Sequence, residues 1–147
     1  MPIKADFLSN RDSYDAGYFT KLYGERPRQT WGDRVRDRRI VHWVHRYRPQ
    51  TARGGALLDI GCGYGYLLER FRGRFSLYGL DISPHAVEQA RARLPDARIV
   101  QADIQQGIPF TERYQVILVV NAIEHLTEPR AALEHIGNAL HPGGLCI

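Results

Sequence analysis

The sequence predicts an α/β fold built on a parallel sheet with helices packed against it. Short apolar runs rich in Leu, Ile and Val recur after residue 55, and helix-like segments separate most of them. The runs are continuous rather than alternating, which is typical of strands covered on both faces. Their spacing of about 20 residues implies right-handed crossovers, and 147 residues suffice for one domain with its own core.

Five of these runs are predicted as strands. In chain order they are Ala56 to Ile60, Phe75 to Leu80, Ala97 to Ala102, Tyr114 to Val120 and Leu145 to Ile147. The connection between the third and fourth runs, Asp103 to Arg113, is short and contains Gly107 and Pro109. We therefore expect at most one turn of helix in that connection.

Three helices are predicted between the strands, because apolar residues recur on one side of each segment. They span Tyr66 to Phe71, Pro84 to Leu94 and Pro129 to Leu140. Ser83 is the expected N-cap of the second helix, with Pro84 in its first turn. The third helix is expected to pack through Leu133, Ile136 and Leu140 and to stop at the Pro-Gly-Gly of residues 142–144.

The first 54 residues are predicted to form a helical segment that packs on a core domain of residues 55 to 147. Helical spacing relates Tyr14, Tyr18 and Leu22, and Phe19 and Tyr23 lie beside them. This aromatic group is typical of a packed helix face.

A second N-terminal helix is predicted from Asp33 to Tyr47. Its core-facing side is expected to contain Ile40, Trp43, Val44 and Tyr47. The opposite side contains Arg34, Arg38, His42, His45 and Arg46. We interpret this basic side as a solvated surface and expect no nucleic-acid partner, because the basic side carries no interleaved aromatic residues for stacking.

The segment that most clearly indicates a ligand-binding site is ALLDIGCGYG, at residues 56–65. Gly61, Gly63 and Gly65 alternate directly after an apolar strand and before a helix. Glycine at these positions allows a tight turn and a close approach of the backbone to a ligand. In a parallel sheet this ligand lies beyond the carboxyl ends of the strands, beside the first strand. The segment therefore predicts a site for a nucleotide-like ligand.

Two further carboxylates end the next two strands at the same edge of the sheet. Asp81 lies 20 residues after Gly61 and can accept hydrogen bonds from both hydroxyl groups of a ribose. Asp103 can accept one from the exocyclic amine of a purine, whose ring would lie between Ile82 and Ile104. Together these residues predict a site for a purine nucleoside.

A dinucleotide site is the competing interpretation of the glycine segment. The pattern Gly-x-Gly-x-x-Gly requires a third glycine at position 66, which is Tyr66. That pattern also holds a pyrophosphate, whereas the carboxylate of Asp59 stands just before the first glycine. A carboxylate there favours a ligand with an ammonium or sulfonium group. A nicotinamide-dependent oxidoreductase is therefore disfavoured.

Five segments resemble the class I S-adenosylmethionine-dependent methyltransferases, particularly the small-molecule group with a Glu-His-Leu segment. They are LLDIGCGYG at 57–65, GLDIS at 79–83, QADIQQGIPF at 101–110, YQVILVVNAIEHL at 114–126 and LHPGG at 140–144. Each motif is weak alone, but all five in this order and spacing are specific. The resemblance implies a Rossmann-like parallel sheet with helices on both faces and the strand order 3-2-1-4-5.

The resemblance also implies S-adenosyl-L-methionine as cofactor and a small-molecule methyl acceptor. The expected cofactor-binding residues are Asp59, Gly61, Cys62, Gly63, Gly65, Asp81, Ile82, Asp103, Ile104 and Asn121. We interpret Cys62 as a small residue that fits the turn rather than as a reactive thiol. Glu124 and His125 are the candidates for a catalytic general base, although orientation of their loop is the preferred interpretation.

The family's core has seven strands, and this chain ends inside the fifth. The resemblance therefore implies an incomplete sheet of about five strands and the front part of a longer protein. Cofactor residues are retained, whereas acceptor residues largely are not. The alternative function is a non-catalytic or fragmentary cofactor-binding module that lacks the acceptor site. The retained motifs are compatible with a quinone-type ring, a sugar, a lipid head group or an amino acid as acceptor.

Composition and charge argue against several other classes of protein. The longest apolar run, residues 116–120, is far too short for a membrane span. Charged residues near the N-terminus argue against a secretory signal, and two cysteines are too few for a disulfide framework or a zinc cluster. These features favour a cytoplasmic location and no metal site. The net charge of +4 indicates no particular partner, and no feature specifies an oligomeric state.

Overall fold

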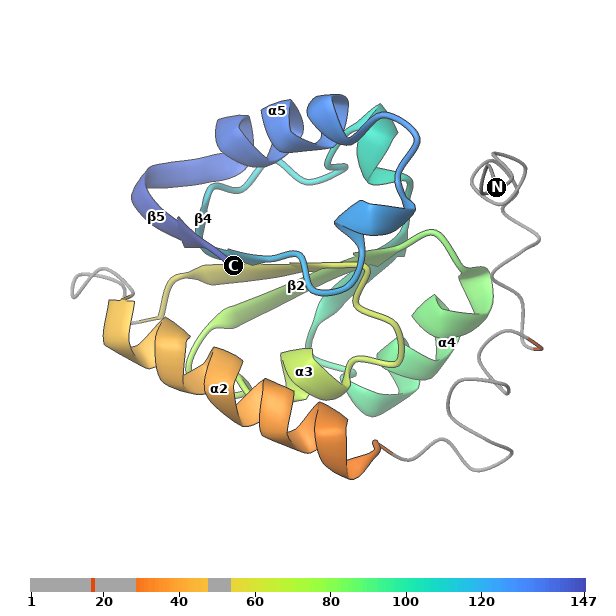
Figure 1. Cartoon of the computed structure of the whole chain (residues 1–147), viewed down its shortest axis with the longest axis vertical. Helices are drawn as coiled ribbons and strands as arrows, with labels where there is room; N and C mark the ends of the chain where they lie inside the picture. Colours follow the sequence, from red (N-terminus) through yellow and green to blue (C-terminus); the bar gives the residue numbers. More distant parts are fainter. Residues whose placement is uncertain (1–16, 18–28, 48–53) are drawn as a thin grey trace, which may run out of the picture.

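A five-stranded parallel sheet forms the centre of the molecule, with its strands in the order β3-β2-β1-β4-β5 (Figure 1). The computed structural model describes residue 17 and residues 29–47 and 54–147. The strands are β1 (Ala56–Ile60), β2 (Ser76–Asp81), β3 (Arg98–Gln101), β4 (Tyr114–Leu118) and β5 (Leu140–Cys146). The strand order implied by the resemblance is therefore confirmed.

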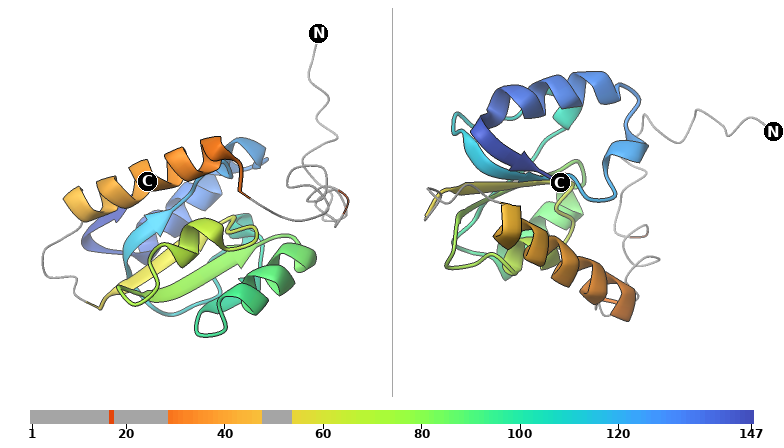
Figure 2. Two further views of the ribbon diagram at one scale, coloured as in Figure 1. Left: turned by 90° about the horizontal axis from the view of Figure 1, so that it is seen from below. Right: turned by 60° about the vertical axis from the view of Figure 1, so that its left-hand side comes forward.

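Helices cover both faces of this sheet. The described helices are α2 (Trp31–Tyr47), α3 (Tyr66–Glu69), α4 (Pro84–Arg93), α5 (Pro129–Ala139) and the 3-10 helices η3 (Ile104–Gln106) and η4 (Ile123–His125). Helices α2, α3 and α4 lie on one face, and α5 lies on the other (Figures 1 and 2). The Rossmann-like arrangement expected from the sequence is confirmed.

Neighbouring residues of the strands pack into two separate apolar clusters. Leu57 belongs to the cluster beneath α2, α3 and α4, where it packs with residues such as Leu68. Leu58 belongs to the opposite cluster, which includes Ile136 of α5. Successive side chains of a strand point to opposite faces of the sheet, and helices cover both faces. Both leucines of β1 are therefore fully buried. This two-sided burial explains why the strands read as continuous apolar runs.

The start of α4 and the link between β3 and β4 agree with the predictions. Ser83 Oγ accepts a hydrogen bond from the backbone N of Ala86 at 3.3 Å, and Pro84 occupies the first helical position. The link contains the single turn η3. Because Ser83 is fully buried, this cap also anchors the end of β2 to the helix that follows.

The end of α5 and the start of β5 differ from the predictions. Helix α5 ends at Ala139, and β5 begins at Leu140, which pairs with Tyr114. Pro142 therefore lies inside the extended segment, and the pairing shifts register to accommodate the extra residues. The predicted contact of Leu133 is also wrong, because Leu133 is 53% exposed while Ala132 and Ile136 are buried.

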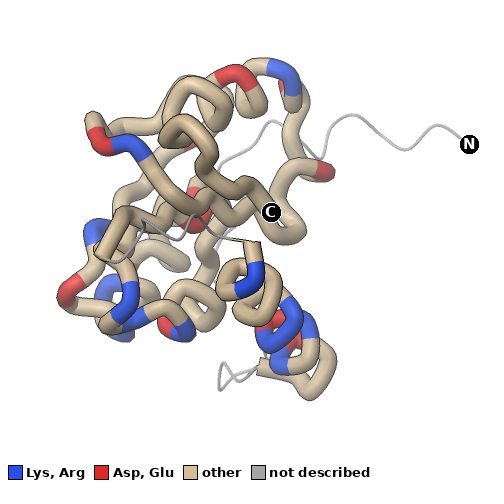
Figure 3. The backbone as a smooth tube through the Cα atoms, turned by 90° about the vertical axis from the view of Figure 1, so that its left-hand side faces the viewer, with Lys and Arg blue, Asp and Glu red and all other residues tan. Residues whose placement is uncertain are grey.

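Helix α2 packs on the sheet through a different stripe than predicted. Ile40 and Val44 are buried as expected, but the third buried residue is Asp37. Trp43 is 47% exposed and Tyr47 is 63% exposed. Trp43 lies about 100° around the helix from Val44, which turns it away from the core. Trp43 and Tyr47 are therefore exposed on the helix whose arginines are blue in Figure 3, and the guanidinium of Arg46 lies 5.3 Å from the centre of the Tyr47 ring. The prediction of a basic side without aromatic residues is wrong.

The residues of the predicted aromatic group, Tyr14, Tyr18, Phe19, Leu22 and Tyr23, lie outside the described residues. The division of the chain at residue 54 stays a prediction. None of the described helices combines the length and the apolar character that crossing a membrane requires.

Candidate functional site

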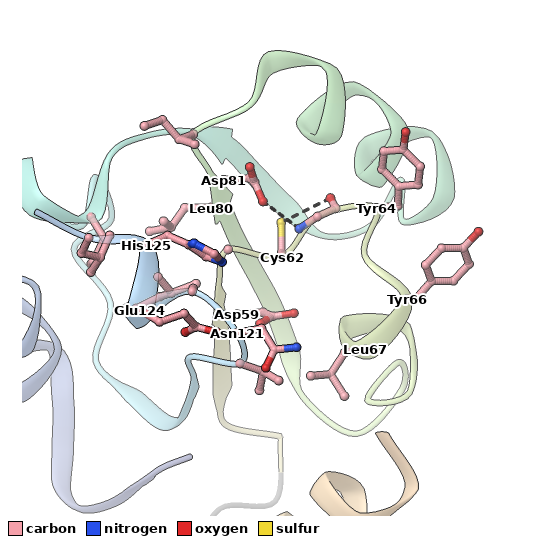
Figure 4. A pocket seen from close by; sticks show the side chains of 18 of the residues that line it. Asp59, Cys62, Tyr64, Tyr66, Leu67, Leu80, Asp81, Asn121, Glu124 and His125 are labelled. Atoms are coloured by element: carbon pink, nitrogen blue, oxygen red, sulfur yellow. Dashed lines mark hydrogen bonds between the residues drawn. The ribbon is translucent and has the colours of Figure 1, made fainter. Parts of the chain in front are cut away.

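A cavity of about 550 Å³ lies over the carboxyl ends of β1, β2, β3 and β4. Strands β1 and β4 are neighbours in the sheet. The strand after β1 lies on one side of this pair and the strand after β4 lies on the other, so a crevice opens between the ends of β1 and β4. This volume falls in the range of small-molecule and cofactor sites. Figure 4 shows side chains from the strand ends and the following loops around this one cavity.

The glycine segment after β1 forms the turn at the base of the cavity. Gly61, Gly63 and Gly65 have φ values of 72°, 51° and 76°, which glycine adopts without strain. A Cβ on Gly61 would lie 2.8 Å from the Cβ of Ala122, in the loop that follows β4. The backbone N of Gly61 donates a hydrogen bond to Leu80 O at 2.8 Å. Glycine therefore allows three strand ends to meet closely.

Asp81 lies at the end of β2 and points toward this turn. Its Oδ2 accepts a hydrogen bond from Gly63 N at 2.8 Å (Figure 4). Its Oδ1 accepts one from Ser83 N at 2.9 Å. The residue is 7% exposed and lines the cavity. Burial raises the pKa of Asp81, while hydrogen bonds from backbone donors, including Ser83 N and Gly63 N, lower it. Each carboxylate oxygen retains a lone pair that can accept a further hydrogen bond.

Asp59 is the buried carboxylate at the end of β1. It is 3% exposed and lines the cavity. No hydrogen bond to its carboxylate forms within the described part of the chain. Burial, and next the charges of Asp81 and Asp37, raise the pKa of Asp59 to about 8. A cation bound beside Asp59 would favour its ionised form.

The end of β3 supplies a third carboxylate. Asp103 is the N-cap of η3, and its Oδ1 accepts a hydrogen bond from Gln105 N at 2.9 Å. The neighbouring Ile104 is buried, and Ile82 follows β2. All three predicted residues line the cavity, together with Gln105. This part of the cavity therefore combines apolar side chains with one anionic acceptor.

The loop after β4 closes the remaining side. Asn121 has a φ of 53°, the one positive value among the described residues other than glycine. Such a conformation is costly and is often found at functional sites. Glu124 and His125 lie in η4 and line the cavity as exposed side chains.

Of the predicted site residues, all except Gly65 line this cavity. The lining set contains Asp59, Gly61, Cys62, Gly63, Asp81, Ile82, Asp103, Ile104, Asn121, Glu124 and His125. Gly65 is instead the N-cap of α3 and lies beside Ala90 of α4 and Leu94, the residue that follows α4. Cys62 is buried, and burial raises the pKa of its thiol well above the usual value. The thiol is therefore protonated at neutral pH and is a poor nucleophile.

The N-terminal end of α2 completes the cavity, which the sequence patterns did not predict. Gln29, Thr30, Asp33 and Arg36 line it. Arg36 forms ion pairs with Asp33 at 3.2 Å and with Asp37 at 2.9 Å. It is the one Lys or Arg among the described lining residues, where carboxylates predominate. No local pattern could have identified Arg36, because its position depends on how α2 docks.

The described residues contain no candidate metal-binding site. No group of three or more His, Cys, Asp or Glu side chains is arranged there to hold a metal ion. The cavity instead offers carboxylates, backbone donors and apolar walls, which suit an organic ligand with cationic and hydroxyl groups.

Comparison with known proteins identifies related sequences. A family model described as a methyltransferase domain matches residues 32–147. The dTDP-3-amino-3,4,6-trideoxy-alpha-D-glucopyranose N,N-dimethyltransferase of Streptomyces venezuelae is 33% identical over 104 residues, covering 68% of this chain and 44% of that protein. The ubiquinone biosynthesis O-methyltransferase of Azorhizobium caulinodans is 31% identical over 120 residues, covering 77% of this chain and 47% of that protein.

Solved structures show the same architecture. CalS10, an amino pentose methyltransferase from Micromonospora echinaspora solved with bound SAM, has a TM-score of 0.67 and 29% identity, covering 80% of this chain and 50% of that one. The N-methyltransferase NodS from Bradyrhizobium japonicum, in complex with S-adenosyl-L-homocysteine, has a TM-score of 0.68 over 96% of this chain and 67% of that one. At 22% identity, NodS supports the fold alone. The chain spans about half the length of the curated relatives it matches.

Proposed function

Because this chain belongs to the class I S-adenosylmethionine-dependent methyltransferase family, we propose that its cavity binds S-adenosyl-L-methionine and that the protein methylates a small-molecule acceptor. The observation that carries this proposal is the position of Asp81. Its buried carboxylate points to the glycine turn and is anchored by the backbone N of Gly63 and of Ser83. A ribose above the turn can donate both hydroxyl hydrogens to the remaining lone pairs of this carboxylate.

The adenine would lie at the end of β3. Asp103 supplies an acceptor for the exocyclic amine, and Ile82 and Ile104 supply apolar walls for the ring. Adenine presents both a donor and two apolar faces, so these residue types match its chemistry.

The methionine part of the cofactor would lie between Asp59 and α2. It carries an ammonium, a carboxylate and the sulfonium, so it needs partners of both signs. Asp59 is the buried acid for a cationic group, and Arg36 is the lining cation for the carboxylate. The charges of Asp59 and Arg36 already influence each other, because Arg36 lowers the pKa of Asp59. This pairing adds Arg36 to the cofactor residues that the sequence predicted.

The protein's contribution to methyl transfer would be alignment, exclusion of water and removal of a proton from the acceptor. When bound, the cofactor supplies a methyl group that is already activated by the positive sulfur. Asn121, Glu124 and His125 border the cavity after β4, where an acceptor would enter. We assign Glu124 or His125 to receive the proton of an amine or hydroxyl acceptor, a class supported by the names of the relatives.

Isothermal calorimetry with S-adenosyl-L-homocysteine tests the cofactor site. Asp81→Asn keeps the size of the side chain but removes its charge, so the affinity should fall at least about tenfold. Asp96→Asn is the matched control, because Asp96 is exposed and lies outside the lining residues; its affinity should equal that of the unaltered protein. Equal affinity for the unaltered and the Asp81→Asn protein would refute the site. Tight binding of S-adenosyl-L-methionine without transfer of its methyl group to an amine or hydroxyl acceptor would favour the cofactor-binding module.

A further inference from the structure

Gln105 connects two sides of the cavity through its amide group. Its Nε2 donates hydrogen bonds to Asp103, at 3.2 Å to Oδ1 and 3.5 Å to Oδ2. Its Oε1 accepts hydrogen bonds from Thr127 Oγ1 at 2.8 Å and from Glu128 N at 2.6 Å. One side chain thus joins the end of β3 to the segment between η4 and α5.

These contacts fix which way the amide faces. The carboxylate of Asp103 requires a donor, and the backbone N of Glu128 requires an acceptor. Only the observed orientation of the Gln105 amide satisfies both. Glutamate at this position could still accept from Thr127 and Glu128, but it could not donate to Asp103.

The same contacts use the two oxygens of Asp103 unequally. Oδ1 accepts a hydrogen bond from Gln105 N at 2.9 Å in addition to the one from Nε2. Oδ2 receives only the longer contact of 3.5 Å. Because Oδ1 already has two donors, Oδ2 is the oxygen that retains lone pairs for a ligand.

We infer that Gln105 is a positioning residue that sets the preference of the cavity for an amino group over an oxo group on the purine. This inference rests on the proposed binding of an adenosine cofactor. Held by Thr127 and the backbone of Glu128, Gln105 keeps Asp103 with Oδ2 available to the 6-amino group. An oxo group at the same place would bring a second acceptor against the carboxylate, which is unfavourable.

Paired affinities for two ligands test this role. The ligands are S-adenosyl-L-homocysteine and S-inosyl-L-homocysteine, which differ in the amino or oxo group of the purine. The unaltered protein should bind the adenosyl compound at least about tenfold more tightly. Gln105→Glu should reduce this ratio to about threefold or less, because the side-chain donor Nε2 to Asp103 is lost while the contacts to Thr127 and Glu128 remain possible.

Two further variants separate positioning from a general effect on stability. Gln106→Glu introduces the same charge at the exposed neighbouring residue and should keep the full ratio. Thr127→Val removes one of the two donors to Gln105 Oε1 and should lower the ratio only about twofold. A simple structural role would weaken both ligands equally and leave the ratio unchanged in every variant.

The outcomes are distinct for the two proposals. An unchanged ratio in Gln105→Glu, in a protein that binds S-adenosyl-L-homocysteine, overturns the role of Gln105 alone. No binding of either ligand by the unaltered protein overturns the cofactor site and this inference together.

Discussion

At the scale of single residues, Asp59 is the most unusual group in the cavity. It is a carboxylate that is 3% exposed, near the charges of Asp81 and Asp37. Burying an ionised group without hydrogen-bond partners is unfavourable, which is why its pKa rises to about 8. A residue that costs stability and lines the cavity is best accounted for by a cationic ligand.

Asp59→Asn should therefore stabilise the unliganded protein in a pH-dependent way. The folded protein holds the Asp59 proton up to about pH 8, whereas the unfolded chain releases it near 3.8. The contribution of protonated Asp59 to the free energy of unfolding is therefore complete below pH 3.8. This contribution is lost as the pH rises through about 8, the pKa of Asp59 in the folded protein. The gain of the variant, measured by urea unfolding, should be small at pH 4 and largest at pH 8.

The same variant should bind S-adenosyl-L-homocysteine at least about tenfold more weakly at pH 8, because the partner of the ligand's cation is lost. Asp96→Asn, an exposed acid, should change neither property appreciably. A gain in stability that is equal at pH 4 and pH 8 would contradict the burial of a titrating carboxylate.

At the scale of elements, the turn between β1 and α3 shapes the base of the cavity. Gly61 has a φ of 72° and lies close to Ala122. The loop after β1 therefore contacts the loop after β4 at a point where a side chain on residue 61 would not fit. The sequence predicted this turn correctly, since alternating glycines directly after an apolar strand are typical of a tight turn that a ligand approaches closely. It did not reveal that the opposing loop is the one after β4.

Gly61→Ala should lower the free energy of unfolding by about 2 kcal/mol or more. The left-handed conformation costs a residue with a Cβ about 1–2 kcal/mol, and the contact of 2.8 Å with Ala122 adds to this. Gly137→Ala is the matched control, because Gly137 lies exposed in α5 with open space around its Cβ position. This control should gain about 0.5–1 kcal/mol in the same urea experiment. Equal effects of the two substitutions would contradict the strained turn.

At the scale of the whole molecule, the cavity depends on segments that are distant in sequence. It is lined by the ends of four strands, the loop that contains η4 and the start of α2. The two apolar clusters on the faces of the sheet hold these segments in place. Binding at this junction should therefore stabilise the entire fold.

S-Adenosyl-L-homocysteine should raise the melting temperature by several degrees at 100 times its Kd, where linkage contributes about 2.7 kcal/mol. NADH at the same concentration should have no such effect, because carboxylates, Asp59 among them, predominate among the charged groups that line the cavity and disfavour an anionic pyrophosphate. Thermal unfolding with each ligand makes the comparison. A shift with NADH as large as that with S-adenosyl-L-homocysteine would favour the dinucleotide interpretation instead.

Local patterns in the sequence determined the elements of the sheet, the glycine turn and the acids at the strand ends. Apolar runs, capping residues and glycine spacing act over a few residues, so their consequences are readable without the fold. The family resemblance added the strand order and the expected cofactor. Most of the predicted site residues then line one cavity, because parallel strands bring their carboxyl ends to the same edge.

Only the tertiary structure decided which residues of α2 face the core and which reach the cavity. The rotation of α2 buries Asp37, exposes Trp43 and brings Arg36 to the cavity. Likewise, the hydrogen bonds of Gln105 to Thr127 and to the backbone of Glu128 join residues that no sequence spacing relates. Such contacts depend on how whole helices and loops pack against the sheet. That packing is governed by the sum of the side-chain contacts on both faces of the sheet rather than by any local sequence pattern.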